Sequence, residues 1–280
     1  MDIALRLGGE CVNADSMQLY RGMDIGTAKL TPAEQRGVPH HLLDVWDVTV
    51  TASVAEYQKL ARAVIDSVEV AVLVGGSGLY VRAAIDELEF PGTDPEIRAR
   101  LEGELAERGS APLHERLREQ DPAAAAAILP SNGRRIVRAL EVIEHTGRPF
   151  SATMPGYDAV YPSVQIGLDV PRPELDERIA VRVERMWQAG LVDEVRSLLG
   201  QGLAEGRTAS RALGYAQVIR FLEGEWSEEQ AIEETVRATR RFARRQESWF
   251  RRDPRVRWLP YDAPDLLERS LALISAHPFA

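Results

Sequence analysis

The chain has 280 residues, of which 45% are hydrophobic and 28% are charged, a composition that is typical of a soluble globular protein with a sizeable core. Its single cysteine, Cys11, excludes an intramolecular disulfide and argues against a cysteine-based zinc site. No apolar run approaches the ~20 residues that a membrane-spanning helix needs, so we expect a cytoplasmic protein with no membrane partner. The net charge of -9 argues against nucleic-acid binding by the whole surface, and any RNA contact must therefore come from local basic patches.

Strand and helix patterns alternate along most of the chain. Residues 11–14 are a short strand candidate, and residues 70–74 are a stronger one, because continuous apolar runs are typical of strands that are buried on both faces of a parallel sheet. Residues 164–170 and 255–259 are predicted as further strands. This alternation predicts an α/β fold with a parallel sheet. The helical patterns lie at residues 53–67, 78–88, 173–189, 191–202, 211–223 and 227–251.

The alternation breaks between about residues 91 and 162, where several helical patterns follow one another without a strand pattern. We interpret residues 91–162 as an all-helical insertion in an α/β core that comprises residues 1–90 and 163–280. Residues 1–7 resemble the last turns of an amphipathic helix that is closed by glycines. A helix that begins at Met1 without a cap or a preceding strand suggests that another segment precedes it in related proteins.

The run from Asp15 to Gln18 follows the first predicted strand directly. In open α/β sheets, ligands bind outside the carboxyl ends of the strands. A carboxylate at this place is well positioned to accept a proton. The alternative is that Asp15 or Ser16 caps a following helix, for which both residue types are favoured.

Two glycine-containing loops are candidates for binding an anion. The loop Gly22–Lys29 combines glycines with a threonine and a lysine, which together can hold a phosphate group. Gly75–Tyr80 follows the strongest strand and opens a helix, so its backbone N–H groups favour an anion. Ordinary turns contain the same residues, and neither loop is specific by itself.

The densest basic segment lies between residues 237 and 257. It carries nine arginines and two acids, so its local charge is +7 in a chain whose total is -9. Most of these arginines are expected on one helical face, with Phe242, Trp249 and Phe250 directed to the core. Because arginine suits bidentate contacts with phosphate, the segment predicts polyanion binding; a solvated basic helix paired with nearby glutamates is the alternative. The nine are Arg237, Arg240, Arg241, Arg244, Arg245, Arg251, Arg252, Arg255 and Arg257.

A smaller basic cluster lies inside the predicted insertion. Arg134, Arg135 and Arg138 could contact an RNA backbone, or they could pair with Glu141 and Glu144 on the same helix. The five histidines of the chain make no metal-ligand spacing with an acid or a cysteine. We interpret the histidines as structural.

Six blocks of sequence become informative when they are taken together: Ala14–Lys29, Val38–Asp44, Val74–Tyr80, Arg134–Glu141, Arg211–Tyr215 and Thr239–Gln246. They closely resemble the signature motifs of the tRNA dimethylallyltransferases, and they occur in that family's order from about residue 8 to 260. Several independent blocks in order are far more specific than any single block.

The resemblance implies a core like that of the P-loop nucleotide kinases, with a helical insertion that grips the tRNA anticodon stem-loop. The family begins with a strand and a Gly-x-x-x-x-Gly-Lys-Ser/Thr loop immediately upstream of the first helix. This sequence has no counterpart of that loop, so we expect the first strand and the P-loop to be missing and the binding of the donor to be weakened. The passage at residues 65–69 is also shorter than the family's usual length.

The implied reaction moves a dimethylallyl group from dimethylallyl diphosphate to N6 of adenine 37, beside the anticodon, with Mg²⁺ as cofactor. A positioned carboxylate can remove the N6 proton as the C–N bond forms, which contributes typically ~10²–10⁴-fold. Cations and backbone N–H groups must stabilise the departing diphosphate. The adenine must also leave its stack to reach the donor.

The resemblance assigns residue roles position by position. Asp15 matches the general base, and Ser77 stands close to the reacting centre, where many relatives have threonine. We expect Lys29 and Arg240 to bind the diphosphate. The positions that match tRNA contacts are Asp15, Ser16, Met17, Gln18, Arg98, Arg134, Arg135, Arg138, Arg211, Gly214, Tyr215, Arg244, Arg245, Gln246 and Arg251.

Two alternatives share these residues. A noncatalytic remnant of the family would still bind tRNA through its arginines. An adenylate isopentenyltransferase would run the same chemistry on a free nucleotide, but it needs no stem-loop grip, so the helical insertion and its arginines count against it. A monomer is expected.

Overall fold

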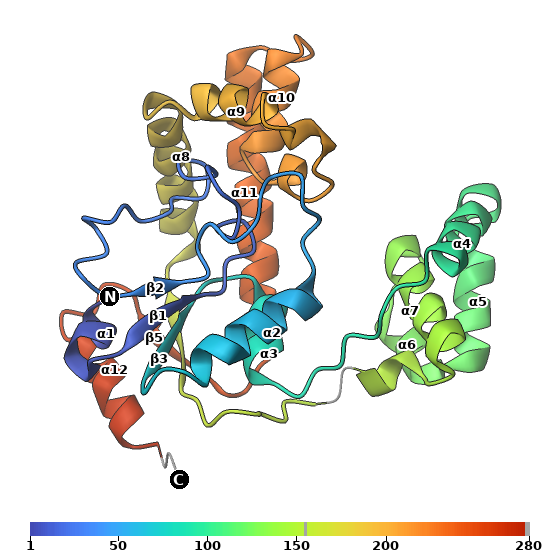
Figure 1. Ribbon diagram of the computed structural model, residues 1–280, viewed down its shortest axis with the longest axis horizontal. Coiled ribbons are helices and arrows are strands. Elements are labelled where there is room, and N and C mark those ends of the chain that lie inside the picture. The colour runs from blue at the N-terminus through green and yellow to red at the C-terminus, as the bar shows by residue number, and fades with distance from the viewer. Residues whose placement is uncertain (154–155, 278–280) are drawn as a thin grey trace. The chain divides into compact units, whose positions relative to one another are not determined.

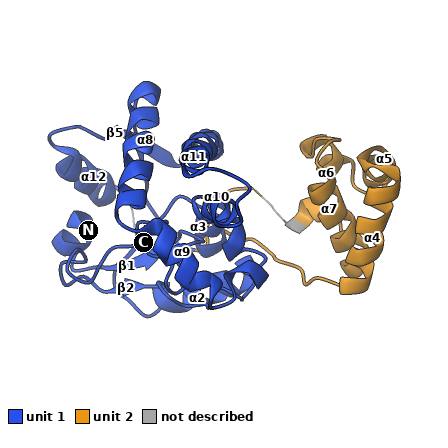
Figure 2. Cartoon of the chain, turned by 90° about the horizontal axis from the view of Figure 1, so that it is seen from above, with its two compact units in different colours: residues 1–85, 161–280 blue, residues 86–160 orange. Residues whose placement is uncertain are grey.

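The computed structural model describes residues 1–153 and 156–277, and the chain forms two compact units. Unit 1 comprises residues 1–85 and 161–280, and unit 2 comprises residues 86–160 (Figures 1 and 2). Residues 154–155, which fall within the expected insertion, and residues 278–280 lie outside the described part.

A three-stranded parallel sheet organises the first part of unit 1. Its strand order is β2-β1-β3, with β1 at Glu10–Asn13, β2 at His40–His41 and β3 at Ala71–Val74. Asn13 pairs with Val74, so β1 and β3 end side by side. The loops that leave these two strands therefore begin at the same edge of the sheet.

A second sheet in unit 1 consists of two parallel strands, β4 (Gln165–Asp169) and β5 (Val256–Pro260). Their pairing runs from Gln165 opposite Val256 to Asp169 opposite Pro260. Each sheet presents an apolar side chain to solvent near the carboxyl end of a strand, since Val74 is 50% and Leu168 is 54% exposed.

The helices of unit 1 begin where local capping residues allow. Ser53 accepts a hydrogen bond from the N–H of Glu56 and starts α2, and Ser227 forms a reciprocal capping box with Gln230 at the start of α11. Gly8 ends the first helix in the left-handed conformation with φ of 63°. The helices are α1 (Asp2–Leu7), α2 (Val54–Ile65), α3 (Gly78–Ile85), α8 (Arg172–Gln188), α9 (Leu191–Leu199), α10 (Tyr215–Leu222), α11 (Glu228–Phe250) and α12 (Leu266–Ser275), with short 3₁₀ turns at Leu203–Glu205 and Ala209–Arg211.

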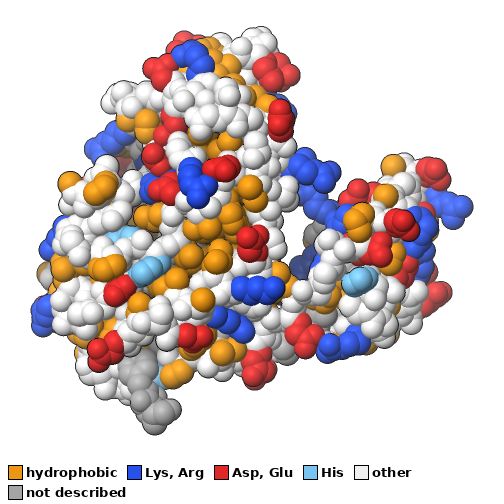
Figure 3. Space-filling view, viewed as in Figure 1, with side chains coloured by type: hydrophobic (Ala, Val, Ile, Leu, Met, Phe, Trp, Pro, Cys, Tyr) orange, Lys and Arg blue, Asp and Glu red, His pale blue; other side chains and the backbone are white. Residues whose placement is uncertain are grey.

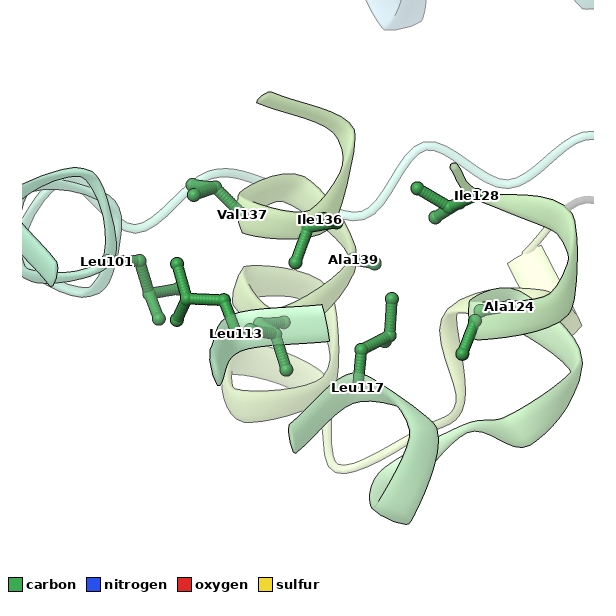
Figure 4. Close-up of a cluster of buried hydrophobic side chains, with 10 residues drawn as sticks. Leu101, Leu113, Leu117, Ala124, Ile128, Ile136, Val137 and Ala139 are labelled. Carbon is green, nitrogen blue, oxygen red and sulfur yellow. The ribbon is translucent and has the colours of Figure 1, made fainter. Parts of the chain in front are cut away.

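Unit 2 is a small helical bundle with its own core. A cluster of buried leucine, isoleucine, valine and alanine side chains from all its α-helices fills the centre, with Leu101, Leu117, Ile136 and Leu140 fully buried (Figure 4). His114 is buried beside this core and contacts the carbonyl oxygens of Ala125 and Ile128. The helices are α4 (Pro95–Arg108), α5 (Ser110–Gln120), α6 (Pro122–Ala127) and α7 (Gly133–Thr146), followed by a 3₁₀ turn at Phe150–Thr153.

The predicted α/β fold with a parallel sheet is confirmed, and four of the five strands lie within a residue of their expected positions. Two elements were missed. The strand β2 has only two residues and no apolar run, so it gives no periodic signal. The helix α12 did give one, in the spacing of Leu267, Leu271 and Ile274 behind a possible cap at Asp265. Among the described residues, no helix is both long enough and apolar enough to cross a bilayer.

Candidate active site at the end of the central strand

Asn13, the last residue of β1, arranges the backbone that follows it. Its side-chain amide donates to the carbonyl oxygens of Asp15 and Leu42, both at 3.0 Å, and its side-chain oxygen accepts from the N–H of Asp15 at 2.9 Å. The N–H of Met17 in turn donates to Oδ1 of Asp15 at 2.8 Å. These bonds hold a half-buried carboxylate at the carboxyl end of the central strand.

Ser77 meets this carboxylate-bearing turn from the neighbouring strand. Its hydroxyl oxygen accepts a hydrogen bond from the N–H of Ser16 at 3.2 Å, and the hydroxyl groups of Ser16 and Ser77 are also 3.2 Å apart. Burial, then the charges of Tyr20 and Asp15, raise the pKa of Tyr80, which follows in α3. The structure thus brings together the predicted catalytic pair, Asp15 and Ser77, at one sheet edge.

Gly75 makes this close approach possible. A Cβ atom at this position would lie 2.4 Å from the backbone carbon of Ala14 and 2.8 Å from the nitrogen of Asp15. Any larger residue would therefore push the two strand ends apart. The sequence showed the glycines of this loop, but it did not show that Gly75 faces the backbone beside Asp15.

The helix α11 closes the same loop from another side. Gln246 donates its side-chain amide to the carbonyl oxygen of Gly76 at 2.9 Å. A Cβ atom at Gly78 would lie 2.2 Å from Nε1 of Trp249, so the indole ring packs directly on the loop. The basic segment of α11 and the turn at Ser77 therefore belong to one continuous site.

A concavity of about 290 Å³ lies on α11 next to this contact. In the space-filling view, hydrophobic side chains gather in the middle of the visible face of unit 1, with basic and acidic side chains around them (Figure 3). Trp249 and Phe242 are each 38% exposed, so the expectation that both face the core was wrong. The concavity is lined by Arg244, Arg245, Ser248, Trp249 and Arg252.

The arginines of the basic segment differ in how far they are engaged. Arg237 pairs with Glu234, and Arg251 pairs with Asp169 while its guanidinium lies 4.1 Å from the ring centroid of Trp258. Arg244 is 65% exposed and only loosely paired, at 3.9 Å from Asp176. Arg245 is exposed and lies over the ring of Phe242. Arg244 and Arg245 are therefore well placed to meet an external phosphate.

The two residues expected to bind diphosphate are engaged inside the protein. The side chain of Lys29 is only 5% exposed, and its ammonium donates to the carbonyl oxygen of Tyr20 and to the carboxylates of Asp24 and Asp44. An ammonium group has three N–H donors, and all three are used inside the protein, which speaks against a diphosphate contact by Lys29. Arg240 directs Nε and Nη2 to the carbonyl oxygen of Asp176, at 3.2 and 2.9 Å, and this engagement speaks against the same role.

The expected tRNA contacts near residue 214 divide into two groups. Arg211 is exposed at the end of a 3₁₀ turn and forms no ion pair within the described residues. Gly214 and Tyr215 are buried, with Tyr215 at 0% exposure. The buried Tyr215 side chain therefore has no surface for a direct RNA contact in this conformation.

The arginines of unit 2 divide in the same way. Arg98 and Arg138 both pair with Glu141, whose side chain is 0% exposed, and Arg138 also donates to the carbonyl oxygens of Pro91 and Gly92. Arg134 and Arg135 are exposed at the first turn of α7 and have no ion pair in the described part of the chain. The alternative considered for Arg138, pairing with Glu141, thus holds, whereas Arg134 and Arg135 face solvent.

The described residues contain no group of three or more histidine, cysteine, aspartate or glutamate side chains that could hold a metal ion. Asp15 supplies one carboxylate at the sheet edge, and its neighbours Ser16 and Ser77 supply hydroxyl groups. Mg²⁺ requires several oxygen ligands in octahedral geometry. These residues alone do not fill such a shell, which in proteins is usually completed by waters and substrate phosphates.

Comparison with known proteins identifies the family. Residues 18–253 match the family described as IPP transferase. A tRNA dimethylallyltransferase of Thermobifida fusca is 73% identical over 275 residues, which cover 97% of this chain and 86% of that protein. The chain belongs to the IPP transferase family.

Solved structures of IPP transferases have the same fold. The full-length tRNA isopentenylpyrophosphate transferase of Bacillus halodurans superposes with a TM-score of 0.71 at 40% identity, over 98% of this chain and 89% of that one. A eukaryotic dimethylallyltransferase acting on tRNA superposes with a TM-score of 0.83 at 22% identity, over 99% of this chain and 76% of that one. At this identity, the likeness supports the fold alone. The resemblance of the six sequence blocks to this family is thereby confirmed.

Proposed function

We propose that this IPP transferase is a tRNA dimethylallyltransferase, which transfers a dimethylallyl group from dimethylallyl diphosphate to N6 of adenine 37, next to the anticodon. The arrangement that carries the proposal is the Asp15 carboxylate beside Ser77, with the arginine-bearing helix α11 packed on the same loop. The names of the relatives given above support this activity over an adenylate isopentenyltransferase.

The proposed reaction requires a proton acceptor for N6 of adenine and a polar group that holds the substrate. A bond forms between N6 of adenine and the allylic carbon, the bond from that carbon to the diphosphate oxygen breaks, and N6 loses one proton. Asp15 is the proposed acceptor of that proton, because only one of its carboxylate oxygens has a hydrogen-bond partner among the described residues, namely the N–H of Met17. The hydroxyl of Ser77 lies where it can hold a substrate polar atom against the turn at Ser16.

Binding of the RNA is assigned to exposed arginines in each unit. The arginines that face solvent lie on three elements: Arg244 and Arg245 on α11, Arg211 before α10, and Arg134 and Arg135 on α7. Guanidinium groups on stem-loop phosphates fix the register of the RNA without reading its sequence. The anticodon stem-loop is the proposed partner, and dimethylallyl diphosphate, with Mg²⁺ as its counter-ion, is the proposed donor.

The decisive experiment is a transfer assay with radiolabelled dimethylallyl diphosphate and either unmodified tRNA or AMP as acceptor. Each reaction is run with Mg²⁺ and, in parallel, with EDTA to test the need for the cation. Label in tRNA that depends on adenine 37 supports the proposal. Label in AMP but not in tRNA would support the adenylate alternative, and tRNA binding without any transfer would support a noncatalytic remnant. Light scattering on the same preparation tests the predicted monomer.

A further inference from the structure

Glu194, on α9, accepts hydrogen bonds from three consecutive backbone N–H groups. The donors are Asp24 at 3.1 Å, Ile25 at 2.7 Å and Gly26 at 3.3 Å. Successive N–H groups that converge in this way form an anion-binding concavity. The loop Gly22–Lys29, which the sequence offered as a phosphate site, therefore directs these donors at a carboxylate of the protein itself.

Tyr215 completes this arrangement from α10. Its hydroxyl group donates to Oε1 of Glu194, and a Cβ atom at Gly26 would lie 2.4 Å from its ring. Burial, and then the charge of Glu194, raise the pKa of Tyr215, so the hydroxyl remains protonated and donates at neutral pH. Glu194 and Tyr215 together fix one side of the loop.

The other side of the loop connects to the candidate active site. The side-chain amide of Gln18 donates to the carbonyl oxygen of Thr27 at 3.1 Å. Lys29 adds a second connection through the carbonyl oxygen of Tyr20 at 3.0 Å. The turn that begins at Asp15 is thus connected at Gln18 to a loop that Glu194 and Tyr215 hold.

We propose that Glu194 and Tyr215 are positioning residues for dimethylallyl transfer, which set the turn Asp15–Gln18 against the target adenine by way of the loop Gly22–Lys29. This inference rests on the proposed function. In this proposal, neither residue contacts the substrate. Their role is to support groups that must lie within a fraction of an ångström of the productive geometry.

The variants Glu194→Gln and Tyr215→Phe test the proposal in the full chain. A glutamine amide cannot accept from all four donors, because its nitrogen is itself a donor. We expect kcat for unmodified tRNA to fall about 10- to 100-fold in Glu194→Gln, since small misplacements of reacting groups cost up to about 10²-fold. The KM for dimethylallyl diphosphate should stay within twofold in both variants. In Tyr215→Phe, kcat should also fall, but by less than in Glu194→Gln.

Two matched controls are present in the chain. Asp193→Asn removes the neighbouring carboxylate of α9, which is 82% exposed and pairs with Arg196. Tyr261→Phe removes another tyrosine hydroxyl that donates to a glutamate, Glu174. Both variants should keep the wild-type kcat. A loss in either control equal to that in Glu194→Gln would overturn the proposal.

Hydrogen exchange supplies a readout that does not depend on activity. In Glu194→Gln, the N–H groups of Met17 and Tyr20, which bond within the turn, should exchange at least fivefold faster, with β4 unchanged. Uniform acceleration across unit 1, or no acceleration in the turn, would contradict positioning. If the wild-type chain transfers nothing, the proposed function fails, while the exchange experiment still decides whether Glu194 holds the turn.

Discussion

The hydroxyl oxygen of Ser77 accepts a hydrogen bond from the backbone N–H of Ser16 at 3.2 Å, although 61 residues separate the two in the chain. This bond joins the loops that leave β1 and β3, and it places Ser77 next to the turn that carries Asp15. The carboxyl ends of two adjacent parallel strands meet here, which is where open α/β sheets bind their ligands.

Replacing Asp15 with asparagine should remove the proton acceptor and keep the turn. An asparagine side-chain oxygen can still accept from the N–H of Met17, so the local backbone should persist. We expect kcat to fall ~10²- to 10⁴-fold, with the Kd for tRNA unchanged within about twofold. Single-turnover transfer measures the loss of rate, and filter binding measures the Kd for tRNA. Transfer by Asp15→Asn at the wild-type rate would reject Asp15 as the base.

A Gly75→Ala substitution should separate the two strand ends. The new methyl group would overlap the backbone of Ala14, so we expect a loss of about 1–3 kcal/mol in the free energy of unfolding and at least a tenfold loss of transfer. Gly103→Ala in α4 is the control, because a Cβ atom there meets nothing within 4 Å. Urea unfolding should show the control to be about 0.5–1 kcal/mol more stable than wild type. Equal stability of the two variants would contradict the close approach.

Arg244→Ala should weaken tRNA binding in a salt-dependent manner. If this guanidinium neutralises one phosphate, the slope of log K against log salt should become less steep by about 1. Arg269→Ala is the control, because Arg269 on α12 is 49% exposed and pairs with Asp265. This variant should leave the slope unchanged. An unchanged slope in Arg244→Ala would show that this arginine is structural.

Two arginines of unit 2 should give opposite results. Arg98→Met leaves the buried carboxylate of Glu141 with Arg138 as its remaining cation, so we expect a loss on the order of 2 kcal/mol in the free energy of unfolding. Arg134→Met removes an exposed arginine and should change stability by less than about 0.5 kcal/mol, while it weakens tRNA binding. Denaturant titrations and binding isotherms on both variants separate the two roles. The reverse pattern would mean that Arg98 faces the RNA.

Stability should fall in alkali because of Tyr215. Its pKa in the folded chain is raised by burial and by the charge of Glu194, above the ordinary value of about 10. The protonated hydroxyl therefore stabilises the fold below about pH 10, and this contribution is lost as the pH rises from there through the folded-state pKa. Urea midpoints at pH 8, 10 and 11 measure the loss, which should be smaller in Tyr215→Phe. An identical pH dependence in that variant would assign the effect to other groups.

Sequence patterns predicted the elements that depend on local signals. The apolar run at Val70–Val74 acts within a few residues, so the strand was predicted close to its observed bounds. The helical patterns at residues 53–67 and 227–251 begin at the observed caps Ser53 and Ser227. Asp15 and Ser77 were predicted as site residues because their motifs resemble a family, and the structure places the two at one edge of the sheet.

Sequence patterns could not show which partners the residues around the loop Gly22–Lys29 have in the folded chain. Asp24 lies five residues from Lys29 and Asp44 lies fifteen. That both carboxylates pair with the one ammonium is seen only in the folded loops. Glu194 gave no signal at all, since an exposed-looking glutamate on an amphipathic helix is ordinary in sequence. Its 170-residue separation from Asp24 places it beyond any local pattern.

The packing of Gln246 and Trp249 on the loop at Gly76 and Gly78 has a consequence for substrate selection. Arg245 and Trp249 lie four residues apart, little more than one helical turn, so α11 sets a short interval between the proposed phosphate contact at Arg245 and the loop at Gly78. A stem-loop with a different backbone spacing would present its purine out of step with Asp15. In the proposed binding mode, the geometry of α11 therefore selects among stem-loops by their backbone spacing.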